Sequence, residues 1–150
     1  VADHEARISD LEAAEVASKT TGYMGRSHNL ATTASGFGYH PVIGISDGVT
    51  IAIQNMQVMW PRPGTFKRLR YQNLFPIADA DTFDFVLNVN GSDTALAITG
   101  LTPGTAGEQS NLTDAVSVSA GDLVVFAQRN GAGTISSGVQ AAWCIDFEED

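Results

Sequence analysis

The clearest pattern along the chain is an alternation of residues near its end, in the segment VQAAWCIDF. One set of alternate positions holds Val139, Ala141, Trp143, Ile145 and Phe147. Successive side chains of a β-strand point to opposite faces, so this alternation predicts a strand with one buried face. A strand this regular is expected deep inside a sheet. The other face would carry Gln140, Ala142, Cys144 and Asp146.

A second alternating segment predicts a β-hairpin. Phe83, Phe85, Leu87 and Val89 fall on one face of a strand, opposite Asp84, Val86 and Asn88. Asn90-Gly91 then supplies two residues that accept positive φ angles, as a tight hairpin turn requires. The chain is expected to return as a strand over residues 95–99.

Further strands are predicted over residues 41–45, 49–58 and 65–74, around Val116 and Val118, and over residues 123–128. About eight short strands separated by turns are typical of an antiparallel sandwich or barrel. Within that class we expect a jelly roll, built from residues 39–150.

The first 18 residues have helical spacing, with alanines that favour a helix. Their apolar seam contains only two strong residues, Ile8 and Leu11, which is too little for an independent coiled coil. Support from an oligomer is therefore expected. The alternative is an amphipathic helix packed on its own domain.

Residues 19–38 are rich in Gly, Ser and Thr and show no sustained period, so they predict an extended arm or linker. A plain flexible hinge is the alternative. If the arm grips a neighbouring surface, the side chains available for that contact are Tyr23, Met24, Arg26, His28 and Leu30.

Composition narrows the possible partners. A formal net charge of −9 disfavours nucleic acid, because phosphate binding needs concentrated Lys and Arg. No apolar run approaches the roughly 18 residues of a membrane span, so we expect no membrane insertion. Cys144 is the one cysteine, which excludes an internal disulfide, and a small buried hydrophobe is its expected role.

Half of the eight basic residues form a strip within nine positions. Simple alternation would place Lys67 on one strand face with Leu69 and Tyr71, and Arg68 and Arg70 on the other. The strip could contact a subunit or an acidic shell, or it could be a solvated edge that blocks stray strand pairing. Its members are Arg62, Lys67, Arg68 and Arg70.

Candidate chemistry is sparse, and we expect no catalytic residues, no cofactor and no metal. His4, His28 and His40 are dispersed and lie outside any nucleophile or zinc motif. A calcium site in an acidic turn is conceivable, although such turns are ordinary solvated loops. Its ligands would be Asp79, Asp81 and Asp84. Asn90-Gly-Ser and Asn111-Leu-Thr match the glycosylation pattern.

The segments GTFKRLRYQN, FDFVLNVNGSDTALAIT, DAVSVSAGDLVVFAQ and VQAAWCIDF resemble the carboxyl-terminal jelly-roll domains of tailed-phage appendage proteins. Those domains are similar to the trimeric tumour necrosis factor (TNF) and C1q heads. The resemblance covers residues 39–148. It implies an all-β, antiparallel jelly-roll sandwich (TNF-like), preceded by a short N-terminal helix that forms a trimeric coiled coil.

The function that this resemblance implies is structural. We expect a homotrimeric decoration or cement protein on the outer surface of a phage capsid, bound to the major capsid protein at three-fold and quasi-three-fold positions. A helical shaft of only about 27 Å favours this over a fibre. The alternative is the receptor-binding tip of a tail or head fibre, recognising a host-surface glycan or protein through residues 104–113 and 130–138. A surface-glycan hydrolase is the third and weakest alternative.

Overall fold

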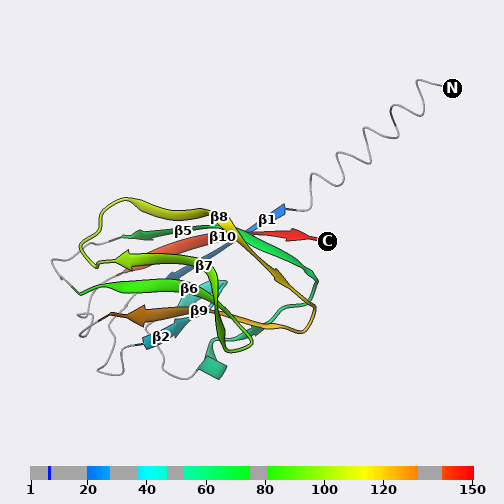
Figure 1. The fold of residues 1–150 in the computed structure, drawn as a ribbon, viewed down its shortest axis with the longest axis horizontal. Helices are drawn as coiled ribbons and strands as arrows, with labels where there is room; N and C mark the ends of the chain where they lie inside the picture. The colour runs from blue at the N-terminus through cyan, green and yellow to red at the C-terminus, as the bar shows by residue number, and fades with distance from the viewer. Residues whose placement is uncertain (1–6, 8–19, 28–36, 47–52, 75–80, 132–139) are drawn as a thin grey trace.

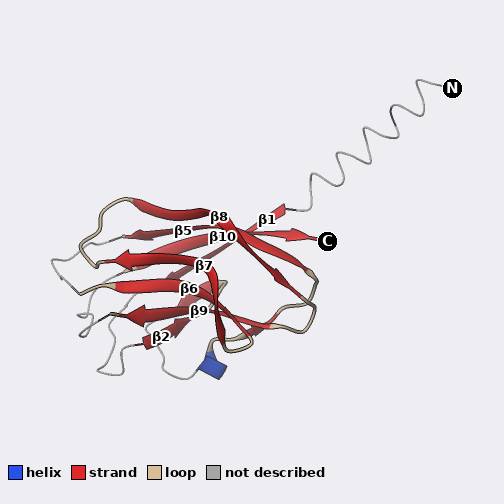
Figure 2. Ribbon diagram, in the orientation of Figure 1, coloured by secondary structure: helices blue, strands red, loops and turns tan. Residues whose placement is uncertain are grey.

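The computed structural model describes residues 7, 20–27, 37–46, 53–74, 81–131 and 140–150, and from residue 20 onward these fold into a sandwich of two β-sheets (Figure 1). Strands make up most of the described residues, as Figure 2 shows. Their bounds are β1 (Thr20–Ser27), β2 (Phe37–His40), β3 (Gly44–Ser46), β4 (Val58–Met59), β5 (Gly64–Asn73), β6 (Phe83–Val89), β7 (Ser92–Leu101), β8 (Glu108–Val118), β9 (Leu123–Asn130) and β10 (Ala141–Glu149), with a 3-10 turn η1 (Ile53–Asn55).

The strand order within the sheets is that of a jelly roll. One sheet runs β3-β1-β10-β5-β8, and the other runs β2-β9-β6-β7 with β4 also paired to β9. The chain crosses between the two sheets repeatedly, and the pairs are antiparallel except for β1 with β3. The prediction of an all-β sandwich is confirmed.

The core lies between the sheets and is rich in aromatic side chains. Trp143 and Ile145 on β10 face Phe85 and Leu87 on β6, and all four are buried. Phe85 stacks on Phe126 with ring centroids 4.6 Å apart and lies 5.2 Å from the Trp143 ring. Burying such a side chain stabilises the fold by about 1.5–3 kcal/mol. The predicted final strand is confirmed, and β10 is the central strand of its sheet.

The predicted hairpin is also confirmed. β6 and β7 are joined by Asn90 and Gly91, whose φ angles of 52° and 84° are both positive, as a two-residue turn between twisted strands requires. The other face of β6 is not the solvated face that alternation suggests, because Val86 and Asn88 are buried too.

The predicted arm is wrong for its first part. Thr20–Ser27 form β1, which pairs along its whole length with β10 and also contacts β3. The inward positions of β1 are Tyr23, Gly25 and Ser27, so the usual run of large apolar residues is missing from the sequence. The sandwich therefore begins at Thr20 and not at residue 39.

The strand predicted over residues 49–58 is wrong for residues 53–57, where η1 and a turn lie, and only Val58 belongs to a strand, the two-residue β4. The strand predicted over 41–45 begins at Gly44. The end of the predicted arm is wrong too, because residues 37 and 38 begin β2. Several predictions lie outside the described residues: the coiled-coil seam Ile8 and Leu11 of the predicted helix, the arm residues His28 and Leu30, and Asp79.

Candidate functional site

The side of the β3-β1-β10-β5-β8 sheet that faces away from the core, here called the outer face, has small residues at its centre. Ala142 and Cys144 are the outward residues in the middle of β10, the central strand. Cys144 lies opposite Met24 of β1 on one side and Arg70 of β5 on the other. Because the central residues are short and the flanking ones are long, the face is hollowed along β10.

The hollowed part of the outer face is apolar. Met24 is 72% exposed and Ile45 is 67% exposed, although both are large hydrophobic residues. Two shallow hollows of about 190 Å³ and 320 Å³ share Met24, Ala142 and Trp143 as lining residues. We call Met24, Ile45, Ala142 and Cys144 the apolar patch.

Sequence reasoning missed most of this patch. Cys144 is half-buried on the outer face and not part of the core, which corrects its predicted role. The available signal was the second set of alternate positions in the final strand, where Ala142 and Cys144 stand in place of polar residues. Ile45 lies on β3, whose pairing with β1 could not be inferred from local sequence.

A β-bulge rearranges the basic strip. The register of β5 shifts against both of its neighbours at Arg68, which has a positive φ of 54°. The extra residue turns Lys67, Arg68 and Arg70 outward together, while Phe66 and Leu69 are buried. The prediction that Lys67 shares a face with Leu69 and Tyr71 is therefore wrong. The edge interpretation is wrong too, because β5 lies between β10 and β8.

Each residue of the basic strip forms an ion pair with a carboxylate of the same chain. Arg68 Nε lies 2.7 Å from Asp146 Oδ2, and Arg70 Nε lies 3.7 Å from Glu108 Oε1. The other two pairs are Lys67 with Glu148, and Arg62 Nη1 with Glu149 Oε2 at 2.7 Å. The hydrogen bond to Glu149 raises the pKa of Arg62. The strip is therefore a set of charges compensated within the chain, and its contact with a shell stays a prediction.

The described residues of the predicted arm divide between two faces. Tyr23 points inward and packs edge-on against Trp60, with ring centroids 5.0 Å apart. Met24 and Arg26 point outward, and Arg26 Nη2 donates a hydrogen bond to Gln140 Oε1 at 3.1 Å. Of these three residues, Met24 and Arg26 are placed to contact a partner.

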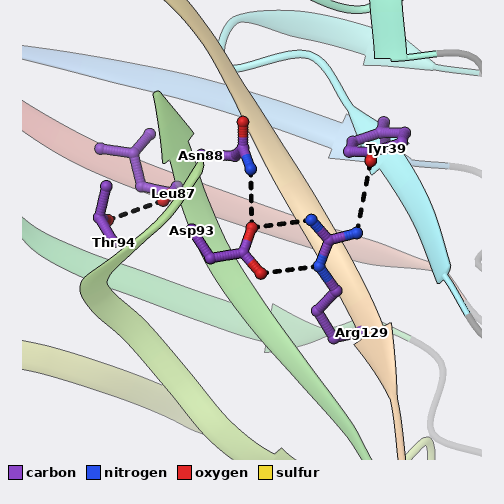
Figure 3. Close-up of polar contacts among 6 residues, drawn as sticks. All are labelled: Tyr39, Leu87, Asn88, Asp93, Thr94 and Arg129. Carbon is purple, nitrogen blue, oxygen red and sulfur yellow. Dashed lines mark hydrogen bonds and ion pairs between the residues drawn. The ribbon is translucent and has the colours of Figure 1, made fainter. Parts of the chain in front are cut away.

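The second sheet carries a dense polar cluster (Figure 3). Arg129 on β9 donates two hydrogen bonds of 2.8 Å to the Asp93 carboxylate on β7, and Asp93 Oδ1 also accepts one of 2.7 Å from Asn88 Nδ2. The Arg129 guanidinium also lies 5.3 Å from the centre of the Tyr39 ring. The hydrogen bond from Arg129 holds the pKa of Asp93 below its usual range. The contacts of Asp93 and Arg129 therefore tie β2, β6, β7 and β9 together.

His40, the one histidine that the structure describes, is in the core. It is fully buried, and its Nε2 lies 3.0 Å from Gln128 Oε1. Burial lowers the pKa of His40 to about 4. A neutral, inaccessible imidazole supports the fold and has no access to a substrate.

Within the described ranges, no group of three or more His, Cys, Asp or Glu side chains is placed to hold a metal ion. Asp84, one of the three predicted calcium ligands, accepts a hydrogen bond of 2.9 Å from the Gly100 backbone. Among the same residues, no helix has the length and apolar character needed to cross a membrane.

Comparisons with known proteins leave the family open. No family model matches the sequence, and no curated protein matches it. A family 35 carbohydrate-binding module from Clostridium thermocellum is a structural neighbour with 13% identity and a TM-score of 0.40, covering 86% of this chain and 98% of that one. An Arthrobacter globiformis T6 isomalto-dextranase complexed with panose has 22% identity and a TM-score of 0.35, covering 86% and 23%.

At these identities and TM-scores, the two likenesses carry no argument about binding or catalysis. Neither neighbour is a phage appendage protein or a TNF or C1q head. The resemblance drawn from the sequence therefore stays a prediction.

Proposed function

We propose that the chain is a non-catalytic structural protein that associates with copies of itself through the outer face. The observation that carries this proposal is the exposure of Met24 and Ile45 beside Ala142 and Cys144. The solvated face of an antiparallel sheet is normally polar. An apolar centre beside paired charges such as Arg68 and Asp146 has the composition of a protein interface.

The proposed assembly is a homotrimer, and the proposed role is decoration of a phage capsid. The resemblance of the strand pattern to trimeric appendage heads supports both. β1 contributes Met24 to the patch, and residues 1–19 immediately precede this strand. Association of three outer faces would bring the seam residues Ile8 and Leu11 of three chains to a high effective concentration, so a weak seam could form a coil.

The proposed partner is the major capsid protein on the outer surface of the virion. A cement protein that binds the assembled lattice and not free subunits stabilises the shell by mass action. In the proposed trimer, the ends of the sandwich outside the patch would remain available for this contact.

The self-association is tested by measuring the native mass with sedimentation velocity. The wild-type protein is expected at three times the 15.8 kDa chain mass. Met24→Asp places a charge in the apolar patch and should shift the protein toward monomer. Met59→Asp is the matched control, because Met59 is 67% exposed but lies on β4 of the other sheet. Equal behaviour of the two variants would contradict the interface.

The role on the virion is tested by cosedimentation with mature particles from which the decoration has been stripped. Binding at one trimer for each three-fold and quasi-three-fold position supports a cement protein. A few copies per particle together with saturable binding to host cells would reject this role in favour of the receptor-binding tip.

A further inference from the structure

Asn90 and Gly91 form an exposed turn whose chemistry the proposed function does not use. In an Asn-Gly pair, the backbone nitrogen of the glycine can attack the side-chain carbonyl carbon of the asparagine. Glycine has no Cβ to hinder that approach. Here both residues have positive φ angles and lie at the tip of the β6–β7 hairpin.

The Asn90 side chain is held at both of its polar atoms by the turn between β8 and β9. Asn90 Nδ2 donates to Asp122 Oδ1 at 2.8 Å, and Asn90 Oδ1 accepts from the Leu123 backbone nitrogen at 2.9 Å. The Asn90 backbone nitrogen donates to the Leu123 carbonyl at 2.8 Å. We call these three contacts the Asn90 clamp.

Asp122 connects the clamp to the rest of this end of the sandwich. Its second carboxylate oxygen accepts from the Ser119 backbone nitrogen at 2.8 Å, and its carbonyl accepts from the Trp60 backbone nitrogen at 2.7 Å. The turn after β6, the turn after β8 and the segment after β4 therefore meet at one residue.

We propose that Asn90 is a deamidation site, and that the Asn90 clamp suppresses the reaction in the folded protein. In the first step, the Gly91 nitrogen forms a bond to Asn90 Cγ and loses its proton, while the Cγ–Nδ2 bond breaks and ammonia leaves. Water then opens the resulting succinimide to aspartate or isoaspartate. The clamp opposes this step because Cγ must rotate toward Gly91, which breaks both side-chain hydrogen bonds.

The product cannot restore the clamp. The new carboxylate has no hydrogen to donate to Asp122 and brings a second negative charge next to it. The hydrogen bond from Asn90 is the largest cause that keeps the pKa of Asp122 below its ordinary value, so its loss also removes stabilisation of the Asp122 carboxylate. Isoaspartate would in addition lengthen the backbone of a two-residue turn. Deamidation therefore converts a link between two turns into a repulsion between them.

The test is a time course of deamidation at mildly alkaline pH, followed by peptide mass mapping with separation of isoaspartate. Asp122→Ala removes one arm of the clamp and should accelerate the reaction at Asn90 roughly five-fold relative to wild type. Wild-type protein unfolded in urea gives the unrestrained rate and should react at least roughly ten-fold faster than the folded protein.

Asp84→Ala is the matched control, because Asp84 also accepts a backbone hydrogen bond near a turn but does not contact Asn90. Its rate should equal that of wild type, and circular dichroism checks that each variant is folded. If Asp122→Ala reacts at the wild-type rate, or if the folded and unfolded wild-type proteins react equally, the clamp does not control the reaction. An equal acceleration in Asp84→Ala would also overturn the proposal, because general loosening would then explain it.

Discussion

His40 and Gln128 join β2 to β9 inside the core, where His40 Nε2 lies 3.0 Å from Gln128 Oε1 and both residues are fully buried. The His40 ring also packs against the rings of Phe85 and Trp143, at 5.9 Å and 5.5 Å. The His40–Gln128 contact lies within one sheet, and the ring contact with Trp143 on β10 reaches the other sheet, so both depend on the same buried imidazole.

We predict that this histidine makes the protein less stable in mild acid. The pKa of His40 is about 4 when folded and 6.5 in the unfolded chain, so the unfolded state binds the proton more readily. Stability is fully present above pH 6.5 and falls as the pH drops toward 4, by roughly 3 kcal/mol in total.

Urea unfolding at a series of pH values between 7 and 4 measures this loss. The His40→Leu variant is the control, since it retains the carboxylates but has no imidazole. The difference in the free energy of unfolding between wild type and variant should shrink as the pH falls. A difference that stays constant over this range would refute the role of His40.

Two substitutions of Asp93 should distinguish the stability contributed by its ion pair with Arg129 from that contributed by its hydrogen bond with Asn88. Asp93→Asn keeps an oxygen for Asn88 and loses the charge, at an expected cost of about 1 kcal/mol because the pair is partly exposed. Asp93→Ala also leaves the fully buried Asn88 Nδ2 without its acceptor, which adds roughly 1–3 kcal/mol. Chemical denaturation measures both costs, and equal costs would show that the hydrogen bond to Asn88 contributes nothing.

Gly25 is expected to tolerate no side chain. A Cβ at this position would lie 2.3 Å from Trp143 Nε1, in the backbone-paired centre of the sheet. Gly25→Ala should destabilise the protein by about 1–3 kcal/mol, as overpacked cores do. Gly22→Ala on the same strand is the control, since the nearest atom to its new Cβ is 3.5 Å away. Thermal melting should rank Gly25→Ala well below Gly22→Ala, and the reverse order would contradict this packing.

The positive φ of Arg68 should make glycine the better residue at the bulge. Arg68→Gly is predicted to be about 1 kcal/mol more stable than Arg68→Ala, because both lose the pair with Asp146 and only glycine adopts φ near 54° freely. Lys67 has an ordinary strand conformation, so at this position the alanine variant should be more stable than the glycine variant. Identical stabilities of the two Arg68 variants would argue against a strained backbone there.

The sequence predicts the parts of the fold in which one strand face is made of large apolar residues. Trp143, Ile145 and Phe147 on β10 have this pattern, and so do Phe83, Phe85 and Leu87 on β6. β1 could not be predicted in this way, because its inward Gly25 leaves space that the ring of Trp143 fills from a strand more than a hundred residues away. The absence of a side chain at position 25 is explained only by the Trp143 ring that occupies this space.

Only part of the candidate surface could be predicted, because strand pairing brings its residues together. Met24 was named from its type alone, whereas Ile45 and Cys144 join it only through strand pairing. The basic strip was recognised, but the bulge at Arg68 and the carboxylate partners on β10 and β8 depend on register between distant strands. The hydrophobic periodicity of each segment does not show which residues of two distant strands pair with each other.

The reactivity of Cys144 tests the central claim, self-association through the outer face, most directly. Cys144 is the one thiol of the chain, and it lies in the apolar patch. The measurement is the rate of maleimide labelling of wild type and of Ile45→Asp at one protein concentration. Ile45→Asp disrupts the patch at β3, whereas the cross-strand partners of Cys144 are Met24 and Arg70. The wild-type thiol should react several-fold more slowly because a second copy covers it. Equal rates in the two proteins would show that the outer face is free and would contradict the proposed assembly.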